Sequence, residues 1–290
     1  MSPSIVKTTS YVDENNNIAN TLFLDIGNSF VKIKIKETFF AWKINDYTVE
    51  KFSRLTSDWD IRKIIVSSVN EEFYRKLTPV LSTNSIEVVH TSALMKNQRI
   101  IDFSNVSNIG TDRQLGLLGA TSIFKPPIIT VDCGSCITTN LLNKDFICLG
   151  GTIMLGIGIY LQTFSTKFPA LPAVKLDDFN EEIGFENSTN ALVRGITSTI
   201  RGGILDCIIS EIKFFRNNKL LDNSGIEIVF TGGWSELVFN ITKEHIYNND
   251  IIRPYIKNIS HQQGLVLSGI QKLFEESFVL EPEVSHNGII

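Results

Sequence analysis

The chain has 290 residues, of which 43% are hydrophobic and 20% are charged, and its formal net charge at pH 7 is -4. This composition is typical of a soluble globular protein, and the length exceeds the roughly 100–200 residues of one domain, so we expect two domains. The lack of a basic excess argues against a nucleic-acid partner, because a phosphate backbone is bound by clustered positive charge.

The first part of the chain predicts an extension followed by a meander of strands. Residues 1–20 lack the apolar segment of a targeting signal and are expected to be flexible. Strands are predicted at 21–26 and 31–35, on either side of an Asp-Ile-Gly-Asn-Ser stretch, and over 38–44. Nowhere does an apolar run approach the ~20 residues that span a bilayer, so no membrane partner is expected.

The next segments alternate between strand and helix patterns. Residues 61–69 predict a buried strand, 71–81 a helix and 86–90 another strand, which is the β-α-β order of a partly parallel sheet. From Gly110 to Phe124, apolar residues at helical spacing predict a helix that Lys125-Pro126-Pro127 ends.

We therefore place a domain boundary near Pro126, between an N-terminal domain at 21–126 and a C-terminal domain at 127–290. The second domain opens with a strand, a turn and a strand over 128–142, as the first domain does. The later predictions are a strand at 147–151, a helix at 183–211 interrupted at Gly202-Gly203, a strand and helix start over 226–238, an amphipathic helix at 260–276 and a short C-terminal tail.

The cysteines predict neither a disulfide framework nor a metal centre. No secretory signal is recognised, so the four cysteines are expected to be reduced thiols in the cytoplasm. Cys133 and Cys136 have the spacing of a zinc or redox pair, but no second pair follows, and the four histidines form no metal pattern.

One sequence device occurs twice: an apolar strand, an Asp, a variable residue, a Gly, a hydroxyl residue and a second strand. The first copy contains Asp25 and Ser29, and the second contains Asp132 and Ser135. The repetition indicates two similar halves that face each other. A third glycine-rich loop, T-G-G at 231–233, lies between a strand and a helix start.

The device suits a bound nucleotide. Glycine lets the backbone approach a phosphate, backbone amides and a hydroxyl group donate to it, and an Asp at a strand end holds a divalent cation through water. The alternative is that Asp25 and Asp132 only cap turns, as Asp often does. The second copy and the T-G-G loop favour the nucleotide interpretation.

Five motifs, D-I-G-N-S-F-V-K, G-T-D-R, V-D-C-G-S, L-G-G-T-I and T-G-G, occur in that order between residues 21 and 275. Their order resembles type III pantothenate kinase, of the acetate and sugar kinase, Hsp70 and actin superfamily. Each motif alone is weak, whereas the order is specific. The resemblance implies an α/β fold of two similar ribonuclease H-like domains, the actin-like ATPase fold, around a central nucleotide cleft.

The resemblance also implies an activity, its cofactors and an assembly. The activity is ATP-dependent phosphorylation of pantothenate to 4'-phosphopantothenate, the first step of coenzyme A biosynthesis. The implied cofactors are ATP, Mg²⁺ and a monovalent cation, K⁺ or NH₄⁺. The family forms homodimers whose interface lies by the pantothenate pocket, so a homodimer is expected here.

The resemblance assigns ATP phosphates to the first loop, where Lys32 would face them and Asp25 would hold Mg²⁺ through water. Asp132 would hold the monovalent cation. The residues assigned to ATP are Asp25, Ile26, Gly27, Asn28, Ser29, Phe30, Val31, Lys32, Ser135, Gly232 and Gly233.

For the acceptor, the resemblance makes Asp112 the catalytic base for the pantothenate hydroxyl group, which suits a loose phosphoryl-transfer transition state. Arg113 could hold pantothenate's carboxylate as a bidentate fork. The alternatives are an exposed Asp-Arg pair that stabilises a helix start, and a helix cap for Thr189. The residues assigned to the substrate are Phe103, Gly110, Thr111, Asp112, Arg113 and Thr189.

Three positions depart from the family pattern, and one of them is Val106, which stands where the family has a Pro. Phe103 stands where the family commonly has a Tyr that reaches the substrate, which removes a hydrogen bond. Asn140 stands where an acid is often found, which removes a charge that could tune cation affinity.

Two other functions stay open from the sequence. The same fold could phosphorylate a sugar, acetate or polyphosphate, although Asp112 beside Arg113 favours a hydroxyl acceptor with an anionic group. A non-catalytic homologue could bind nucleotide and act through protein partners, because fold does not determine function.

Overall fold

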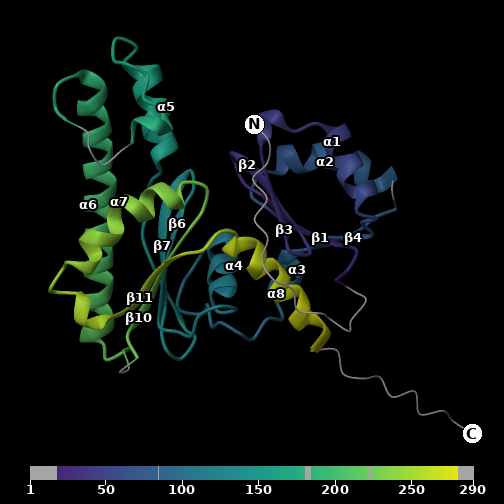
Figure 1. Cartoon of the computed structure of the whole chain (residues 1–290). Coiled ribbons are helices and arrows are strands. Elements are labelled where there is room, and N and C mark those ends of the chain that lie inside the picture. The colour runs from purple at the N-terminus through teal and green to yellow at the C-terminus, as the bar shows by residue number, and fades with distance from the viewer. Residues whose placement is uncertain (1–17, 84, 180–183, 222–223, 280–290) are drawn as a thin grey trace, which may run out of the picture. The chain divides into compact units, whose positions relative to one another are not determined.

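The computed structural model describes residues 18–83, 85–179, 184–221 and 224–279. Most of the expected N-terminal extension and nearly all of the expected C-terminal tail lie outside these ranges. The chain forms two compact units (Figure 1): unit 1 comprises residues 1–100 and 266–290, and unit 2 comprises residues 101–265.

Unit 1 is built on a five-stranded sheet of order β3-β2-β1-β4-β5. The β1-β2 and β2-β3 pairs are antiparallel, and the β1-β4 and β4-β5 pairs are parallel. Its elements are β1 (Thr21–Ile26), β2 (Phe30–Ile35), β3 (Thr38–Lys43), the 3₁₀ turn η1 (Ile44–Asp46), α1 (Val49–Asp58), β4 (Lys63–Ser68), α2 (Glu71–Thr83), β5 (Glu87–His90), α3 (Thr91–Met95) and α8 (Leu265–Val279).

Strand β1 is buried along its whole length because both faces of the sheet are covered. Leu22, Leu24 and Ile26 belong to a core cluster that includes Phe52 of α1 and Leu77 of α2. Side chains alternate along a strand, so Phe23 points to the opposite face, where its ring packs edge-on against Phe274 of α8 at 6.1 Å.

Unit 2 has a sheet of order β11-β10-β6-β7-β8, and β9 also pairs with β7. Its elements are α4 (Thr111–Ala120), β6 (Ile128–Cys133), β7 (Cys136–Leu142), β8 (Cys148–Gly150), β9 (Ile153–Leu155), α5 (Ile157–Lys167), η2 (Leu176–Asp178), α6 (Ser188–Asn217), β10 (Ile226–Thr231), α7 (Ser235–Tyr247), η3 (Arg253–Tyr255) and β11 (Ile256–His261).

The two sheets have the same topology. Strands β6, β7, β8, β10 and β11 repeat the order and directions of β1, β2, β3, β4 and β5. Asp25 and Asp132 are each the fifth residue of a six-residue first strand. This is the ribonuclease H-like arrangement in two copies, so the predicted fold class is confirmed.

The observed units differ from the division expected at Pro126. Residues 101–126 group with unit 2, because α4 contacts β6 and β7 and because Asp102 forms a β-bridge with Ile147. Helix α8 groups with unit 1, where Phe274 packs on β1.

Two element predictions were wrong in detail. Helix α6 runs through Gly202 and Gly203 without a break, since Ile196, Ile200 and Ile204 continue one buried stripe across them. The C-terminal helix begins at Leu265 rather than at residue 260, because residues 256–261 pair with β10 as strand β11.

Candidate active site

The β1-β2 turn presents the first motif at the end of the unit 1 sheet. Asp25 is buried and stands opposite Lys32 in the antiparallel register, with Lys32 Nζ 3.5 Å from Asp25 Oδ2. The backbone N–H of Gly27 donates to the Phe30 carbonyl at 3.0 Å, which closes the turn. Asn28 at its tip is exposed. The turn therefore offers backbone amides to solvent beside a buried carboxylate.

The corresponding turn of unit 2 brings the second and third glycine-rich motifs together. Thr231 at the end of β10 is in register with Asp132 at the end of β6. Gly232 follows with φ +100°, and a Cβ atom there would overlap Asp132 Oδ1 and lie 2.7 Å from the Cys133 nitrogen. A glycine is needed here because the T-G-G backbone lies directly against the Asp132 carboxylate.

The Ser135 turn is fixed from both sides. The N–H of Gly134 donates to the Cys136 carbonyl at 2.9 Å, and the N–H of Gly156 donates to the Ser135 carbonyl at 3.0 Å. Ser135 thus lies in the same β6-β7 turn as Asp132, as the repeated device predicts.

Asp112 and Arg113 occupy different environments although they are adjacent in the first turn of α4. Asp112 is exposed, and its Oδ1 accepts the N–H of Arg113 at 2.8 Å. Arg113 is partly buried: its Nε donates to Asn140 Oδ1 at 2.5 Å, and its Nη2 donates to the Thr139 carbonyl at 3.1 Å. The alternative of an exposed Asp-Arg pair is therefore wrong for Arg113.

Asn140, where the family pattern has an acid, is part of this arrangement. Its side-chain amide is buried and donates to the Thr130 hydroxyl group at 3.1 Å. Thr130 and Asp132 are two residues apart on β6, so their side chains point to the same face of the sheet. Asn140 of β7 is in register with Thr130 and therefore shares that face. Arg113 therefore lies on the sheet face that carries Asp132.

The other residues assigned to the substrate lie in two places. Phe103 is partly buried in the segment before α4, and Gly110 and Thr111 form the start of α4. Thr189 lies in the first turn of α6 and is partly buried. It is not the helix cap, because the Asn187 side chain accepts the N–H of Asn190 at 2.9 Å.

Sequence reasoning missed one functional candidate, Glu211 of α6. This residue is only 6% exposed, its Oε1 accepts the hydroxyl proton of Thr139, and its buried Oε2 has no hydrogen-bond partner among the residues that the structure describes. Burial raises the pKa of Glu211 to about 7, against the opposing effects of Thr139 and Arg113. The signal in the sequence is that this acid follows Ile208 by three residues, on a helix face that is otherwise rich in isoleucine, which indicates a buried carboxyl group.

The cysteines do not form a reactive or metal-binding pair. Burial, followed by the Asp132 charge, raises the pKa of the Cys133 thiol well above its ordinary value, which makes it inert. Within the described ranges, no three His, Cys, Asp or Glu side chains are grouped so as to hold a metal ion. Mg²⁺ needs few protein ligands because it keeps several of its waters, so one carboxylate such as that of Asp25 fits it.

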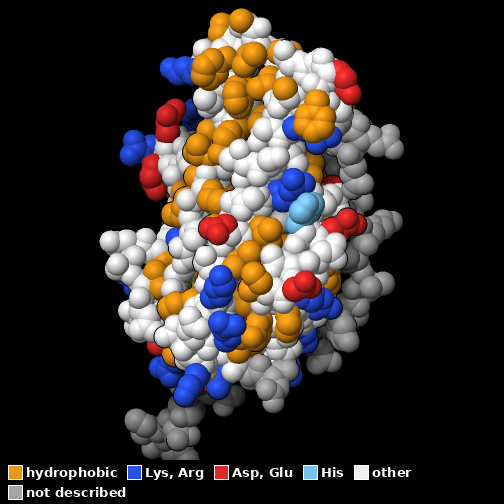
Figure 2. All heavy atoms as spheres, turned by 90° about the vertical axis from the view of Figure 1, so that its left-hand side faces the viewer, with side chains coloured by type: hydrophobic (Ala, Val, Ile, Leu, Met, Phe, Trp, Pro, Cys, Tyr) orange, Lys and Arg blue, Asp and Glu red, His pale blue; other side chains and the backbone are white. Residues whose placement is uncertain are grey.

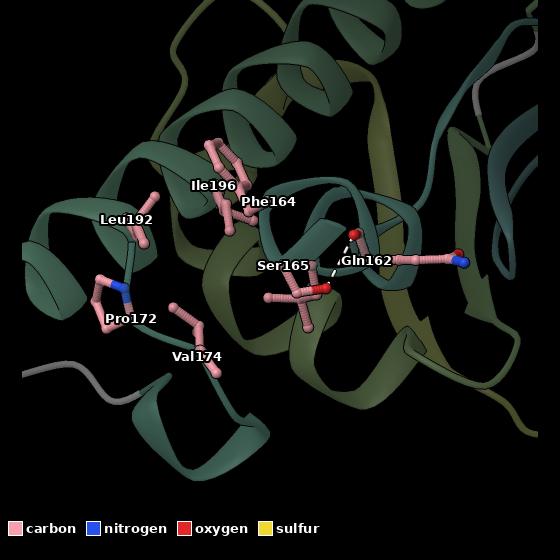
Figure 3. Close-up of a pocket in the computed structure, with 9 residues that line it drawn as sticks. Gln162, Phe164, Ser165, Pro172, Val174, Leu192 and Ile196 are labelled. Atoms are coloured by element: carbon pink, nitrogen blue, oxygen red, sulfur yellow. Dashed lines mark hydrogen bonds between the residues drawn. The ribbon is translucent and has the colours of Figure 1, made fainter. Parts of the chain in front are cut away.

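An apolar hollow of about 320 Å³ lies between α5, the segment at 172–174 and α6 (Figure 3). Leu192 and Ile196 of α6 face Phe164 of α5 and Pro172 across it. The described residues that line the hollow are apolar apart from Gln162 and Ser165, a lining that suits an apolar group better than a phosphate.

Two ribonuclease H-like units, each with an Asp and a glycine turn at the end of its first strand, place the chain in the actin-like ATPase fold class. A family model for type III pantothenate kinase matches residues 21–210. The chain belongs to the type III pantothenate kinase family.

Curated relatives agree with this assignment. The type III pantothenate kinase of Sulfurihydrogenibium sp. (strain YO3AOP1) is 26% identical over 219 residues, which cover 73% of this chain and 81% of that protein. The Thermosipho melanesiensis type III pantothenate kinase is 26% identical over 245 residues, 79% of this chain and 94% of that protein.

A solved structure supports the fold. A conserved Campylobacter jejuni protein assigned to the Baf family of transcriptional activators matches with a TM-score of 0.52 and 21% identity, over 89% of this chain and 100% of that chain. In the described part of the chain, no helix is both long and apolar enough to cross a membrane.

Proposed function

We propose that this chain transfers the γ-phosphoryl group of ATP to the primary hydroxyl group of pantothenate, with the residue roles set out below. Pantothenate phosphorylation is the first step of coenzyme A biosynthesis, and the kinase family uses ATP with a divalent cation. The family match over residues 21–210 carries this proposal, because it spans both Asp-Gly turns and the Asp112-Arg113 pair. We place the reaction in the cytoplasm, where ATP is available.

In unit 1, the β1-β2 turn is the proposed ATP phosphate site. The amides of Asn28 and Ser29 and the Lys32 ammonium group would bind phosphate oxygens, Gly27 would keep the turn closed, and Asp25 would hold the waters of Mg²⁺. The pair formed by the buried Asp25 and the partly buried Lys32 supports this, since its two charges have a defined position before any ligand binds. Ile26, Phe30 and Val31 supply the strand ends that hold the turn.

In unit 2, Asp132 is the proposed ligand of K⁺ or NH₄⁺. Its position is equivalent to that of Asp25, but its cross-strand neighbour is Thr138 instead of a lysine. A carboxylate oxygen is a suitable ligand for a hard cation, which supports this role. Ser135 would contact ATP, and Gly232 and Gly233 would lie by the adenosine.

Asp112 is the proposed catalytic base. Its carboxylate is exposed at the start of α4 and can accept the proton of the acceptor hydroxyl group as the phosphoryl group is transferred. Arg113 would bind the carboxylate of pantothenate, since Asn140 and Thr139 hold its guanidinium group in one orientation. Phe103, Gly110, Thr111 and Thr189 would complete the acceptor site.

We also propose that the active form is a homodimer. Figure 2 shows hydrophobic side chains gathered on the face of the molecule that α5 and α6 form. Phe168 and Leu176 lie between α5 and α6 in the chain, and they are 52% and 54% exposed. An apolar surface of this kind is typical of a protein-protein interface.

The test is phosphorylation of pantothenate by the purified protein with Mg²⁺-ATP, with Na⁺ or K⁺ as the monovalent cation, followed by mass spectrometry of the product. We expect 4'-phosphopantothenate, formed faster in K⁺. The Asp112→Asn variant should lose roughly 10²–10⁴-fold in kcat, because the proton acceptor is removed.

The matched control is Asp145→Asn, which neutralises another exposed Asp of unit 2. It should leave kcat unchanged. No product from the wild-type protein while ATP is still bound would indicate another acceptor or a non-catalytic homologue. Wild-type turnover by the Asp112→Asn variant would exclude Asp112 as the base.

A further inference from the structure

Glu211 is a buried carboxyl group that the proposed reaction does not use. It lies on the face of α6 whose isoleucines, Ile200, Ile204 and Ile208 among them, pack in the unit 2 core. A carboxyl group in such a core costs free energy unless its oxygens are hydrogen-bonded. Only one oxygen has a partner among the described residues, the Thr139 hydroxyl group.

Thr139 joins Glu211 to Arg113 across the sheet. Its side chain points to the α6 side, as do Ile137 and Leu141, two positions away along β7 in each direction. Its carbonyl group accepts the Arg113 Nη2–H, and Arg113 comes from α4. One residue therefore connects the buried acid on α6 with the cation on α4.

The pairing of β7 with its edge strands is interrupted at this residue, although the Thr139 N–H still donates to the Thr152 carbonyl at 3.1 Å. Strand β7 pairs with β9 over 136–138 and with β8 over 141–142, and residues 139–140 lie between the two pairings. Gly150 and Gly151, with φ +95° and +151°, lead from β8 towards β9, and a Cβ atom on Gly151 would overlap the Thr139 carbonyl. Because Gly151 has no side chain, the Thr139 carbonyl stays accessible to the Arg113 guanidinium group.

We propose that Glu211 is a positioning residue for the acceptor: it holds Thr139, Thr139 holds Arg113, and ionisation of Glu211 weakens the binding of the acceptor's carboxylate by Arg113. This inference rests on the proposed role of Arg113. A negative charge on Glu211 offsets part of the Arg113 charge that a bound carboxylate needs. When Glu211 is neutral, the full positive charge of Arg113 is available to the carboxylate of the acceptor.

Among the groups named here, Glu211 is the one whose charge changes near neutral pH. Arg113 stays charged, and the pKa of Cys207, one turn earlier on α6, is raised by burial, so its thiol stays neutral. The Thr139 and Thr152 hydroxyl groups, 2.8 Å apart, carry no charge. Asp206 precedes Cys207 on α6 and is exposed, whereas burial raises the pKa of Glu211 to about 7.

The experiment compares the pantothenate KM of the wild-type protein and the Glu211→Gln variant between pH 6 and pH 8.5. Gln keeps an oxygen that accepts the Thr139 hydroxyl proton but cannot ionise. We expect the wild-type KM to rise about fivefold with pH and the variant KM to stay flat at the low-pH value. The kcat and the KM for ATP should be alike in both proteins.

The matched control is Glu227→Gln, at a second buried carboxyl group of unit 2 that also has an unpartnered oxygen. Glu227 is in register with Ile128, at the far end of β6 from Asp132, and pairs with Lys257 at 3.0 Å. This control should keep the wild-type pH profile. A Glu211→Gln profile that matches the wild type, or an equal change in the KM for ATP, would reduce Glu211 to a structural residue and overturn the proposal.

A second readout does not need turnover. In ¹³C-glutamate-labelled protein, the carboxyl resonance that is lost in Glu211→Gln reports the titration of Glu211. The Arg113→Gln variant should move its midpoint to higher pH, because a neighbouring positive charge is removed. If the midpoint of the Glu211 titration does not move, the coupling between Glu211 and Arg113 is wrong, even if the enzyme phosphorylates pantothenate. If the midpoint moves as expected but the wild-type protein forms no pantothenate product, only the proposed function is wrong.

Discussion

At the scale of single residues, Glu211 makes the stability of the protein depend on pH. Its pKa in the folded protein is raised by burial to about 7, above the ordinary value of 4.5. The folded state therefore binds the proton more tightly than the unfolded state does. The resulting stabilisation is fully present below pH 4.5 and is lost as the pH rises through 7.

We predict that the free energy of unfolding of the wild-type protein falls by about 3 kcal/mol more than that of Glu211→Gln between pH 4.5 and pH 8. Gln has no proton to lose in this range, so its contribution stays constant. Urea unfolding followed by circular dichroism at a series of pH values measures the difference. Parallel curves for the two proteins would show that Glu211 does not titrate in this way.

The two glycines of the T-G-G loop provide a matched pair. At Gly232, with φ +100°, a Cβ atom would lie 2.7 Å from the Cys133 nitrogen, whereas a Cβ atom at Gly233 would meet nothing within 4 Å. Gly232→Ala should destabilise the protein by roughly 1–3 kcal/mol and raise the KM for ATP, because the loop must move away from Asp132. Gly233→Ala should change stability by under about 0.5 kcal/mol. Equal thermal shifts for both variants would contradict this assignment of strain.

At the scale of elements, α8 stabilises unit 1 although it follows unit 2 in the chain. Phe274 is 3% exposed and packs against Phe23 at 6.1 Å and Phe278 at 4.7 Å. Phe274→Ala should cost about 3–5 kcal/mol, since the lost ring leaves a cavity against β1. The control Phe214→Ala removes a ring on α6 that is 46% exposed, and it should cost far less.

Hydrogen exchange locates the effect. With Phe274→Ala, we expect faster exchange in β1 and β4, and unchanged exchange in β6 and β10. Uniform destabilisation of both sheets would argue that the two units unfold as one and that α8 is not specific to unit 1.

Some elements of the fold could be predicted from the sequence, and others could not. The Asp25 and Asp132 turns were predictable, because an apolar strand, an acid and a glycine turn are local signals. The last two residues of strand β11, Ser260 and His261, fell within a predicted helix, because they become strand only through pairing with β10. The Glu211-Thr139-Arg113 connection joins α6, β7 and α4, and no local pattern predicts that contact.

At the scale of the whole molecule, one topology is used twice with different charges at equivalent positions. The residue opposite the first-strand acid is Lys32 in unit 1 and Thr138 in unit 2. In the proposed function, the first turn binds phosphate oxygens and the second binds a monovalent cation. Under this proposal, duplication of a fold supplies two turns that differ in their cross-strand residues and in their ligands.

The homodimer is the remaining prediction at this scale. The chain mass is 32.5 kDa, so a dimer has a mass of about 65 kDa (twice 32.5). We expect this mass for the wild-type protein in light scattering coupled to size-exclusion chromatography. The double variant Phe168→Ser with Leu176→Ser should shift the mass towards that of a monomer, because it removes exposed apolar side chains from the proposed interface.

Ile123→Ser is the matched control, since Ile123 is 48% exposed but follows α4 and lies outside the α5-α6 segment. It should remain dimeric. If the pantothenate pocket lies by this interface, the monomeric variant should also show a higher KM for pantothenate while its affinity for ATP is unchanged, because the β1-β2 turn belongs to unit 1. A monomeric wild-type protein with full activity would separate catalysis from assembly in this chain.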